Sequence, residues 1–316
     1  MTADAARPLL VLVGPTAVGK TALSLALAAR FGGEIVSADS RLFYRGMDIG
    51  TAKPSAAERV ATPHHLIDIC DPDETLSLGQ YQRLARVTID GVLARGRLPI
   101  LVGGTGQYVM AVVEGWGVPE VAPRPALRAA LEGLGGAEAA RWLAALDPTA
   151  AGRIDPRNIR RVVRALEVTL VSGRPISELQ RKTSPPYDVR LVGLRRDRTA
   201  LYARIDARVD EMMAAGLLDE VRRLLDAGYA EQPPLSGLGY RQLLAHLRGE
   251  TTLDEAITRI KFETHRFARQ QATWFRADDE RIAWFEADDG EGVVGYVASW
   301  LEERGSRGAG EISSDH

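Results

Sequence analysis

GPTAVGKT, which spans Gly14–Thr21, reads as Gly, four residues, Gly, Lys and Thr. It follows an apolar run, Leu9–Val13, and precedes a helical pattern at Ala22–Arg30. A strand before such a motif and a helix after it are the context of a phosphate-binding loop. Its glycines let backbone N–H groups converge on phosphate oxygens, and the helix directs its N-terminus at the anion.

The loop therefore predicts a cradle for linked phosphates with a metal ion beside them. Lys20 is expected to reach the terminal phosphates, and Thr21 is expected to ligate Mg²⁺. The occupant is either a nucleoside triphosphate or another molecule with two linked phosphates, and the motif does not choose between them. The predicted diphosphate-binding residues are Gly14, Pro15, Thr16, Ala17, Val18, Gly19, Lys20 and Thr21.

Further strand signals predict an α/β fold. Glu34–Ser40 and Leu98–Gly106 are apolar runs that end in small or polar residues, as buried parallel strands do. Between them lies a helical pattern that ends at Gly96. This alternation indicates a doubly wound parallel sheet of the P-loop NTPase type, whose ligands gather at the carboxyl ends of the strands.

The pattern of strands alternating with helices ends after this region. Gly and Pro punctuation at Glu114–Pro125 marks a boundary, and Arg124–Leu179 has helical patterns without strand signals. A second linker, Gln180–Asp188, leads into a strand at Val189–Leu194 and long helices from Thr199 to Phe275. We expect a catalytic core at 1–116 and 189–290, an inserted all-helical domain at 117–188, and a disordered tail at 304–316.

Composition is that of an ordinary globular protein, with 45% apolar and 26% charged residues and a net charge of −2. No apolar run is long enough to span a bilayer, and we expect no signal peptide, because the predicted strand before the phosphate loop comes so early. Cys70 is the single cysteine, so a reducing interior is expected. We predict a cytoplasmic protein with no membrane partner.

Asp39 and Thr105 are candidates for chemistry at the sheet edge. Asp39 ends a predicted strand, where it could take a proton from a substrate near the phosphates or simply cap a turn. Arg41 behind it suggests that a second substrate is held there. In Gly103–Gly106 the glycines leave space for a ligand and Thr105 can bond it, although a tight turn is as good an explanation.

Arginines supply the positive charge, since only four of the 40 Lys and Arg residues are lysines. Arg204 and Arg208 lie four apart on one helix and form either a pyrophosphate clamp or surface pairs with nearby acids. The helices at Arg153–Val168 and Thr258–Arg276 each gather arginines on one face, which is either a solvated face or a polyanion site. Their aromatics, Phe267, Trp274 and Phe275, are expected in the core.

Eight segments together resemble the tRNA dimethylallyltransferase family, also called tRNA isopentenyltransferases. The resemblance covers about residues 10–276, and the lack of a Cys/His zinc finger after Phe275 makes the bacterial type the closer likeness. The segments are GPTAVGKTALS, SADSRLFYRGMDIGTAKP, HHLIDICDPDE, PILVGGTGQY, RALEV, RIDARVDEMMAAGLLDEV, GLGYRQL and ARQQATWFR.

The resemblance implies transfer of a dimethylallyl group from dimethylallyl diphosphate to N6 of the adenine immediately 3′ of the anticodon. Asp39 matches the family's catalytic base, and Lys20 with Mg²⁺ would stabilise the departing pyrophosphate. The matching arginine is Arg204 or Arg208, and the sequence does not distinguish them. Thr16 would flank the diphosphate, and Thr105 would contact the target nucleotide.

The resemblance also implies that the inserted domain and core loops grip the tRNA anticodon stem-loop. We expect a monomer, since one chain could grip one tRNA. Two enzyme readings compete with the implied activity: prenylation of free AMP or ATP, and a small-molecule kinase. An RNA-binding nucleotide switch is the non-enzyme reading. The implied tRNA-binding residues are Asp39, Ser40, Arg41, Leu42, Thr105, Arg128, Arg160, Arg161, Arg164, Gly237, Gly239, Tyr240 and Arg241.

Overall fold

The computed structural model describes residues 7–310, with side chains up to Arg304. Two compact units make up this part of the chain. The second unit is Met110–Pro185, and the first unit consists of the described residues on either side of it. The bounds expected for the insertion, 117–188, start and end later than those of the second unit.

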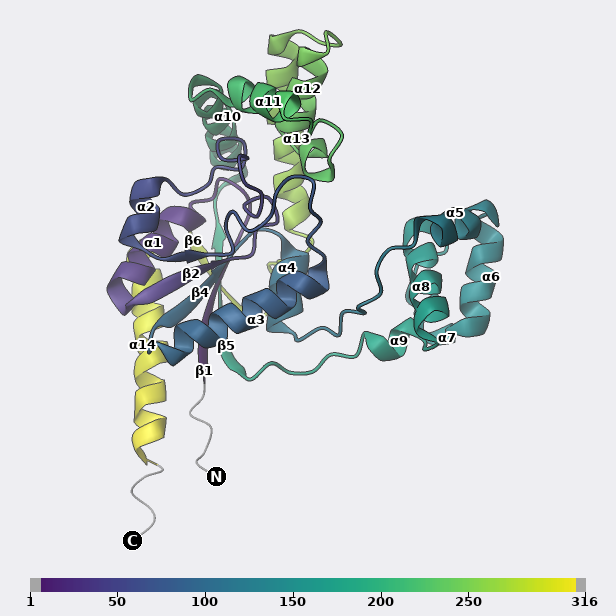
Figure 1. Cartoon of the computed structure of the whole chain (residues 1–316). Coiled ribbons are helices and arrows are strands. Elements are labelled where there is room, and N and C mark those ends of the chain that lie inside the picture. Colours follow the sequence, from purple (N-terminus) through teal and green to yellow (C-terminus); the bar gives the residue numbers. More distant parts are fainter. Residues whose placement is uncertain (1–6, 311–316) are drawn as a thin grey trace. The chain divides into compact units, whose positions relative to one another are not determined.

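A six-stranded, all-parallel sheet forms the centre of the first unit, in the order β3-β2-β4-β1-β5-β6 (Figure 1). The predicted α/β class is therefore confirmed. The two edge strands, β3 and β6, carry no clear strand signal in the sequence. The strands are β1 (Arg7–Val13), β2 (Gly33–Ser37), β3 (His64–His65), β4 (Leu98–Val102), β5 (Tyr187–Arg195) and β6 (Ile282–Glu286).

Helices cover both faces of the sheet, so β1 is buried on both of its faces. Leu10 and Leu12 pack with α1 (Lys20–Phe31) and α14 (Gly290–Gly310) in one core. Side chains alternate along a strand, so the intervening residues face the other side, where α3 (Leu78–Ala94) packs against β1, β2 and β4. α14 continues to Gly310, so a helix replaces the first part of the expected tail, and residues 311–316 lie outside the described residues.

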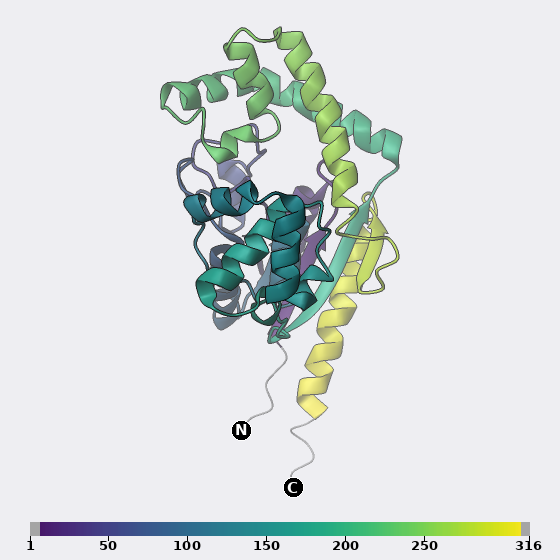
Figure 2. The ribbon, with the colours of Figure 1, turned by 90° about the vertical axis from the view of Figure 1, so that its right-hand side faces the viewer.

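A layer of helices stands beyond the carboxyl edge of the sheet and has a core of its own (Figure 2). Met47, from the segment after β2, packs into this core with Val209 and Tyr240. Within residues 7–310, no helix combines the length and apolar character that crossing a bilayer requires. The layer comprises α10 (Arg198–Ala214), α11 (Leu217–Asp226), η1 (Pro233–Ser236), α12 (Tyr240–Leu247) and α13 (Leu253–Gln271), and the shorter α2 (Ala56–Ala61) lies beside the sheet.

The second unit is a helical bundle around a separate apolar core. Asn158 caps its central helix, since its side chain accepts a hydrogen bond from the Arg161 backbone N–H at 3.3 Å. The two segments that lead in and out are bonded to each other: Thr183 N donates to Gly115 O at 2.8 Å, and Gly117 N donates to Arg181 O at 3.0 Å. The helices are α5 (Pro125–Gly133), α6 (Gly136–Leu146), α7 (Pro148–Ala151), α8 (Ile159–Ser172) and α9 (Ile176–Leu179), while α4 (Gly106–Val113) spans the boundary between the units.

Candidate active site

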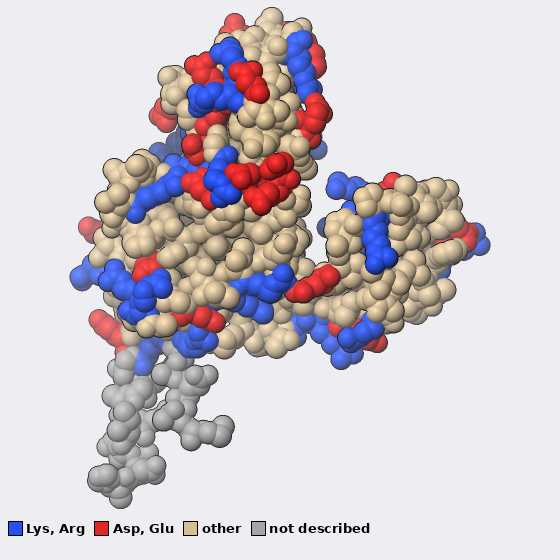
Figure 3. Space-filling model, in the orientation of Figure 1, with Lys and Arg blue, Asp and Glu red and all other residues tan. Residues whose placement is uncertain are grey.

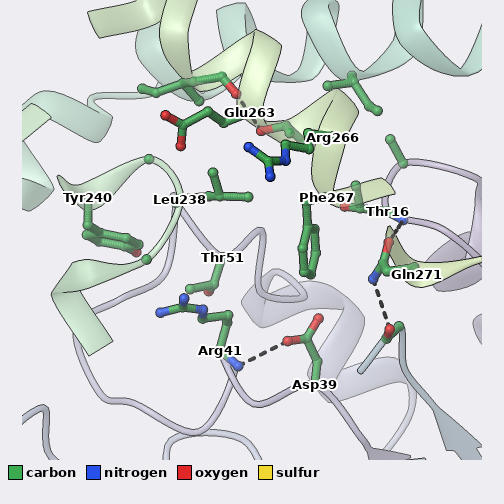
Figure 4. A pocket seen from close by; sticks show the side chains of 18 of the residues that line it. Thr16, Asp39, Arg41, Thr51, Leu238, Tyr240, Glu263, Arg266, Phe267 and Gln271 are labelled. Atoms are coloured by element: carbon green, nitrogen blue, oxygen red, sulfur yellow. Dashed lines mark hydrogen bonds between the residues drawn. The ribbon is translucent and has the colours of Figure 1, made fainter. Parts of the chain in front are cut away.

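A cavity of about 870 Å³ opens at the carboxyl edge of the sheet in the first unit (Figure 4). Its floor comes from the loops after β1, β2 and β4, and its walls come from α10, α13 and the segment before α12. Parallel strands end at one edge, so these loops meet although they are far apart in sequence. The cavity lies where the sequence predicts a ligand to bind.

The phosphate loop has the backbone shape that its glycines predict. Gly14 has φ +145°, and a Cβ there would lie 2.6 Å from the Leu194 carbonyl oxygen, so only glycine fits. Gly19 has φ +121° and immediately precedes α1, whose first residue is Lys20. The helix N-terminus therefore faces the loop, as an anion site needs.

Lys20 is held inside the loop. Its Nζ donates to the carbonyl oxygens of Gly14 at 2.9 Å and Pro15 at 2.8 Å. Burial lowers the pKa of Lys20 to about 8; the carboxylate of Asp39 opposes this shift and the guanidinium of Arg208 adds to it. Lys20, Asp39 and Arg208 are thus close enough to interact electrostatically.

The segment after β2 turns Asp39 into the cavity. Asp39 Oδ1 accepts a hydrogen bond from the Arg41 backbone N–H at 3.0 Å, and Ser40 also lines the cavity. The guanidinium of Arg41 donates to Pro234 O at 2.7 Å, so it also supports the loop before α12. Leu42 does not line the cavity; its backbone bonds Asp39 and Asp68.

Arg204 and Arg208, which the sequence leaves as alternatives, occupy different surroundings. Arg204 is exposed, and its Nε donates to the Ala17 carbonyl oxygen of the phosphate loop at 3.1 Å. Arg208 lines the cavity, where burial lowers the pKa of its guanidinium and Asp39 opposes that shift. Arg208 is therefore the one placed to contact a bound anion, while Arg204 braces the loop.

Two of the glycines after β4, Gly104 and Gly106, line the cavity, and other parts of the protein also approach this segment closely. A Cβ on Gly103 would lie 2.4 Å from Ala38 O, and one on Gly104 would lie 2.3 Å from the side-chain nitrogen of Gln271. The next residue, Thr105, also lines the cavity.

The GLGYR loop also lines the cavity, but its polar side chains are engaged within the fold. Tyr240 is 1% exposed and donates its hydroxyl to Glu220 at 2.7 Å. Arg241 is paired with Glu263. Gly237 packs against the Arg41 guanidinium, and Gly239 has φ +88°. These residues shape the wall, and the polar groups of Tyr240 and Arg241 already have protein partners.

Sequence reasoning missed the exposed aromatics at the end of α13. Phe267 is 39% exposed and Trp274 is 41% exposed, and both line the cavity; the expectation of core packing is correct only for Phe275, at 3%. Figure 4 shows Phe267 and Arg266 projecting from α13 into the cavity. Aromatic rings with arginines at an open cavity suit a planar base.

The residues around the loop fit the expected Mg²⁺. Thr21 is exposed at the start of α1, next to Lys20 of the phosphate loop, and Asp39 lines the cavity. Among the described residues, no cluster of three or more His, Cys, Asp or Glu side chains could hold a metal by itself. Mg²⁺ commonly binds through one or two protein oxygens together with substrate phosphates and waters, so a sparse donor set is suitable.

Four predicted tRNA-binding arginines lie in the second unit and divide into two kinds. Arg128 and Arg164 are tied to the buried carboxylate of Glu167, at 2.8 and 2.6 Å. Arg160 and Arg161 are exposed at the start of α8, and no carboxylate of the described residues pairs with them. Figure 3 shows blue Lys and Arg patches on this unit over a mostly uncharged surface. Of these four arginines, Arg160 and Arg161 are therefore the two whose charge is not neutralised by Glu167.

Comparison with known proteins gives a consistent result. The family model described as IPP transferase matches residues 42–278. A tRNA dimethylallyltransferase of Roseiflexus sp. (strain RS-1) is 60% identical over 274 residues, which cover 85% of this chain and 90% of that protein.

Two solved structures are also similar. The full-length tRNA isopentenylpyrophosphate transferase of Bacillus halodurans is 41% identical with a TM-score of 0.72, covering 95% of this chain and 98% of that one. A eukaryotic dimethylallyltransferase acting on tRNA is 28% identical with a TM-score of 0.78, covering 90% of this chain and 74% of that one. The phosphate loop, the cavity and these similarities together place the chain in the IPP transferase family.

Proposed function

We propose that this chain transfers a dimethylallyl group from dimethylallyl diphosphate to N6 of the adenine immediately 3′ of the anticodon in tRNA, with release of pyrophosphate. The observation that carries the proposal is that Asp39 and Arg208 line one open cavity, while Lys20 of the adjoining phosphate loop is close enough to interact electrostatically with both. An anion site beside a carboxylate suits transfer of a group from a diphosphate to an amine.

The reaction forms a bond between N6 and C1 of the dimethylallyl group while the bond from C1 to the diphosphate oxygen breaks. Asp39 accepts the proton that N6 loses, because an exocyclic amine is a weak nucleophile whose lone pair is delocalised into the ring. Lys20 and Arg208 stabilise the negative charge that develops on the departing diphosphate. Thr21 would hold Mg²⁺, which would supply further neutralisation of the diphosphate charge.

The acceptor adenine has to leave its stack to reach Asp39, as bases do in other enzymes that act on them. Phe267 and Trp274 offer aromatic surface inside the cavity, and Thr105 offers a hydroxyl. Arg160 and Arg161 of the second unit would contact phosphates of the anticodon stem. A single chain carries both kinds of surface, so we propose a monomer, acting in the cytoplasm where tRNA is modified.

The test is transfer of a labelled dimethylallyl group, with Mg²⁺, to unmodified tRNA and in parallel to AMP and ATP. Label in tRNA alone supports the proposal. Label in free nucleotide would instead indicate an adenylate prenyltransferase. ATP hydrolysis or phosphate transfer without prenylation would indicate a kinase-like use of the loop.

A further inference from the structure

Gln271 connects two loops of the cavity floor. It is the last residue of α13 and is 6% exposed. Its Oε1 accepts a hydrogen bond from the Thr16 backbone N–H at 2.8 Å, and its Nε2 donates to the Gly104 carbonyl oxygen at 2.9 Å. Figure 4 shows both bonds. One amide side chain thereby joins the phosphate loop after β1 to the Thr105 loop after β4.

The two hydrogen bonds of Gln271 explain why a glycine stands at position 104, which lies against the Gln271 side chain. Gly104 is outside the positive-φ glycines, so alanine could adopt its backbone conformation. A Cβ there would nevertheless lie 2.3 Å from Gln271 Nε2 and 3.4 Å from Gly14 O. The position is kept small so that the Gln271 amide can lie between the two loops.

Gln271 belongs to α13, the helix that also contributes residues to the part of the cavity where the acceptor base is proposed to bind. Arg266 and Phe267 lie within a turn or so of Gln271 on α13 and line the same cavity. The backbone of Thr16 belongs to the donor loop, and Gly104 precedes Thr105 on the acceptor side. A shift of either loop by about 1 Å would misplace the reacting atoms, which can cost about a hundredfold in rate.

We propose that Gln271 is a positioning residue that fixes the donor loop and the acceptor loop relative to each other. This inference rests on the proposed prenyl transfer for its kinetic consequences. It acts through the backbone of Thr16 and Gly104 and requires no contact with either substrate. Its two hydrogen bonds have separable roles: the Thr16 bond shapes the diphosphate site, and the Gly104 bond aligns Thr105.

The test compares three variants by binding and by kinetics. Gln271→Ala removes both bonds, and we expect about tenfold weaker binding of inorganic pyrophosphate with Mg²⁺, a similar rise in the donor KM, and a lower kcat. Gln271→Glu can still accept from Thr16, but its carboxylate cannot donate to Gly104 and adds a negative charge beside the phosphate loop, so we expect weaker pyrophosphate binding as well as a lower kcat. Gly104→Ala should reproduce the Gln271→Ala result, and combining the two should add little.

Gln80→Ala is the matched control. Gln80 also bonds the backbone, accepting from Ser77 N at 2.9 Å, but it caps α3 outside the cavity. Thermal unfolding midpoints of all variants reveal a purely structural effect. Unchanged pyrophosphate Kd, donor KM and kcat in Gln271→Ala, with only a lower midpoint, would overturn the proposal, as would full additivity with Gly104→Ala.

The pyrophosphate measurement separates this inference from the proposed function. A parent protein that binds pyrophosphate but prenylates no tRNA would contradict the proposed function only. A Gln271→Ala variant that binds pyrophosphate as tightly as the parent would contradict the role of Gln271, whatever the reaction.

Discussion

The two carboxylate oxygens of Asp39 have different surroundings. Oδ1 is fixed by the Arg41 backbone N–H at 3.0 Å, and Figure 4 shows the other oxygen facing the cavity. Asp39→Asn keeps an acceptor for Arg41 but removes the proton acceptor. We expect single-turnover prenyl transfer to fall about 10³-fold while tRNA affinity is retained. Near-normal turnover in this variant would mean that another group takes the proton.

Lys20 makes donor binding dependent on pH. Its pKa is about 8 in the free protein, mainly because it is buried. A bound diphosphate favours the protonated form and raises this pKa, so the complex holds a proton that the free protein loses above pH 8. Pyrophosphate affinity should therefore fall as pH rises above 8, with proton uptake on binding, as calorimetry in buffers of different ionisation enthalpy can measure.

Lys20→Met is the control for this experiment because pyrophosphate itself titrates in the same range. The variant should bind more weakly, and it should lose the part of the proton uptake that belongs to Lys20. Equal proton uptake by the parent and the variant would show that Lys20 does not titrate on binding.

The stability of helix α8 depends on the buried carboxylate of Glu167, which lies among several arginines in the sequence. Glu167 is fully buried and accepts hydrogen bonds from the Arg124 backbone N–H, Arg128 and Arg164, at 2.7, 2.9 and 2.6 Å. Burial by itself would raise the pKa of Glu167, but these donors lower it to about 2. A folded-state pKa below the unfolded value stabilises the fold above pH 4.5, and this contribution is lost as pH falls from 4.5 towards 2.

Glu167→Gln should therefore destabilise the second unit by about 2 kcal/mol at neutral pH, because it leaves two arginines without their buried partner. Chemical denaturation with a probe in the second unit, such as Trp142 fluorescence, measures this loss. Arg174→Ala, which removes an exposed pair with Glu178, should change stability by less than about 0.5 kcal/mol. Equal stability of parent and Glu167→Gln would contradict the role given to the carboxylate.

Binding of a whole tRNA should depend on Arg160 and Arg161 more than on their paired neighbours. Both are exposed and without a carboxylate partner among the described residues, so they can release counterions from RNA phosphates. The double variant Arg160→Ala/Arg161→Ala should bind tRNA more weakly and reduce the slope of log affinity against log salt by about 2. Its kcat at saturating tRNA should be unchanged, and Arg174→Ala should leave the slope as it is.

The phosphate loop could be predicted from the sequence because its shape is determined by residues that are close together in the chain. The glycines and Lys20 of the phosphate loop determine its shape directly, and Asp39 lies where a strand ends. The acceptor side depends on packing between distant segments. Nothing near Gln271 indicates that it meets Thr16, and a count of arginines cannot show that Glu167 neutralises Arg128 and Arg164.

The same limit explains the errors of interpretation. The spacing of Phe267 and Trp274 suits either a core or a cavity wall, and only the placement of α13 beside the sheet edge distinguishes them. Gly103 and Gly104 signal close approach, but the sequence does not say whether a ligand or another part of the chain approaches. The edge strands β3 and β6 escaped prediction because β3 is short and β6 is only partly buried.

The bonds between Thr183 and Gly115, and between Gly117 and Arg181, have a consequence for how such proteins can change in evolution. They bring the two ends of the insertion together before the helices begin. The entropy of closing a loop grows only slowly with its length, and here the closing point is fixed by the loop's own ends. The helices between these paired segments could thus be lengthened, trimmed or replaced with little loss of stability in the sheet. The helical unit can then diversify while the sheet that carries the phosphate loop stays constant.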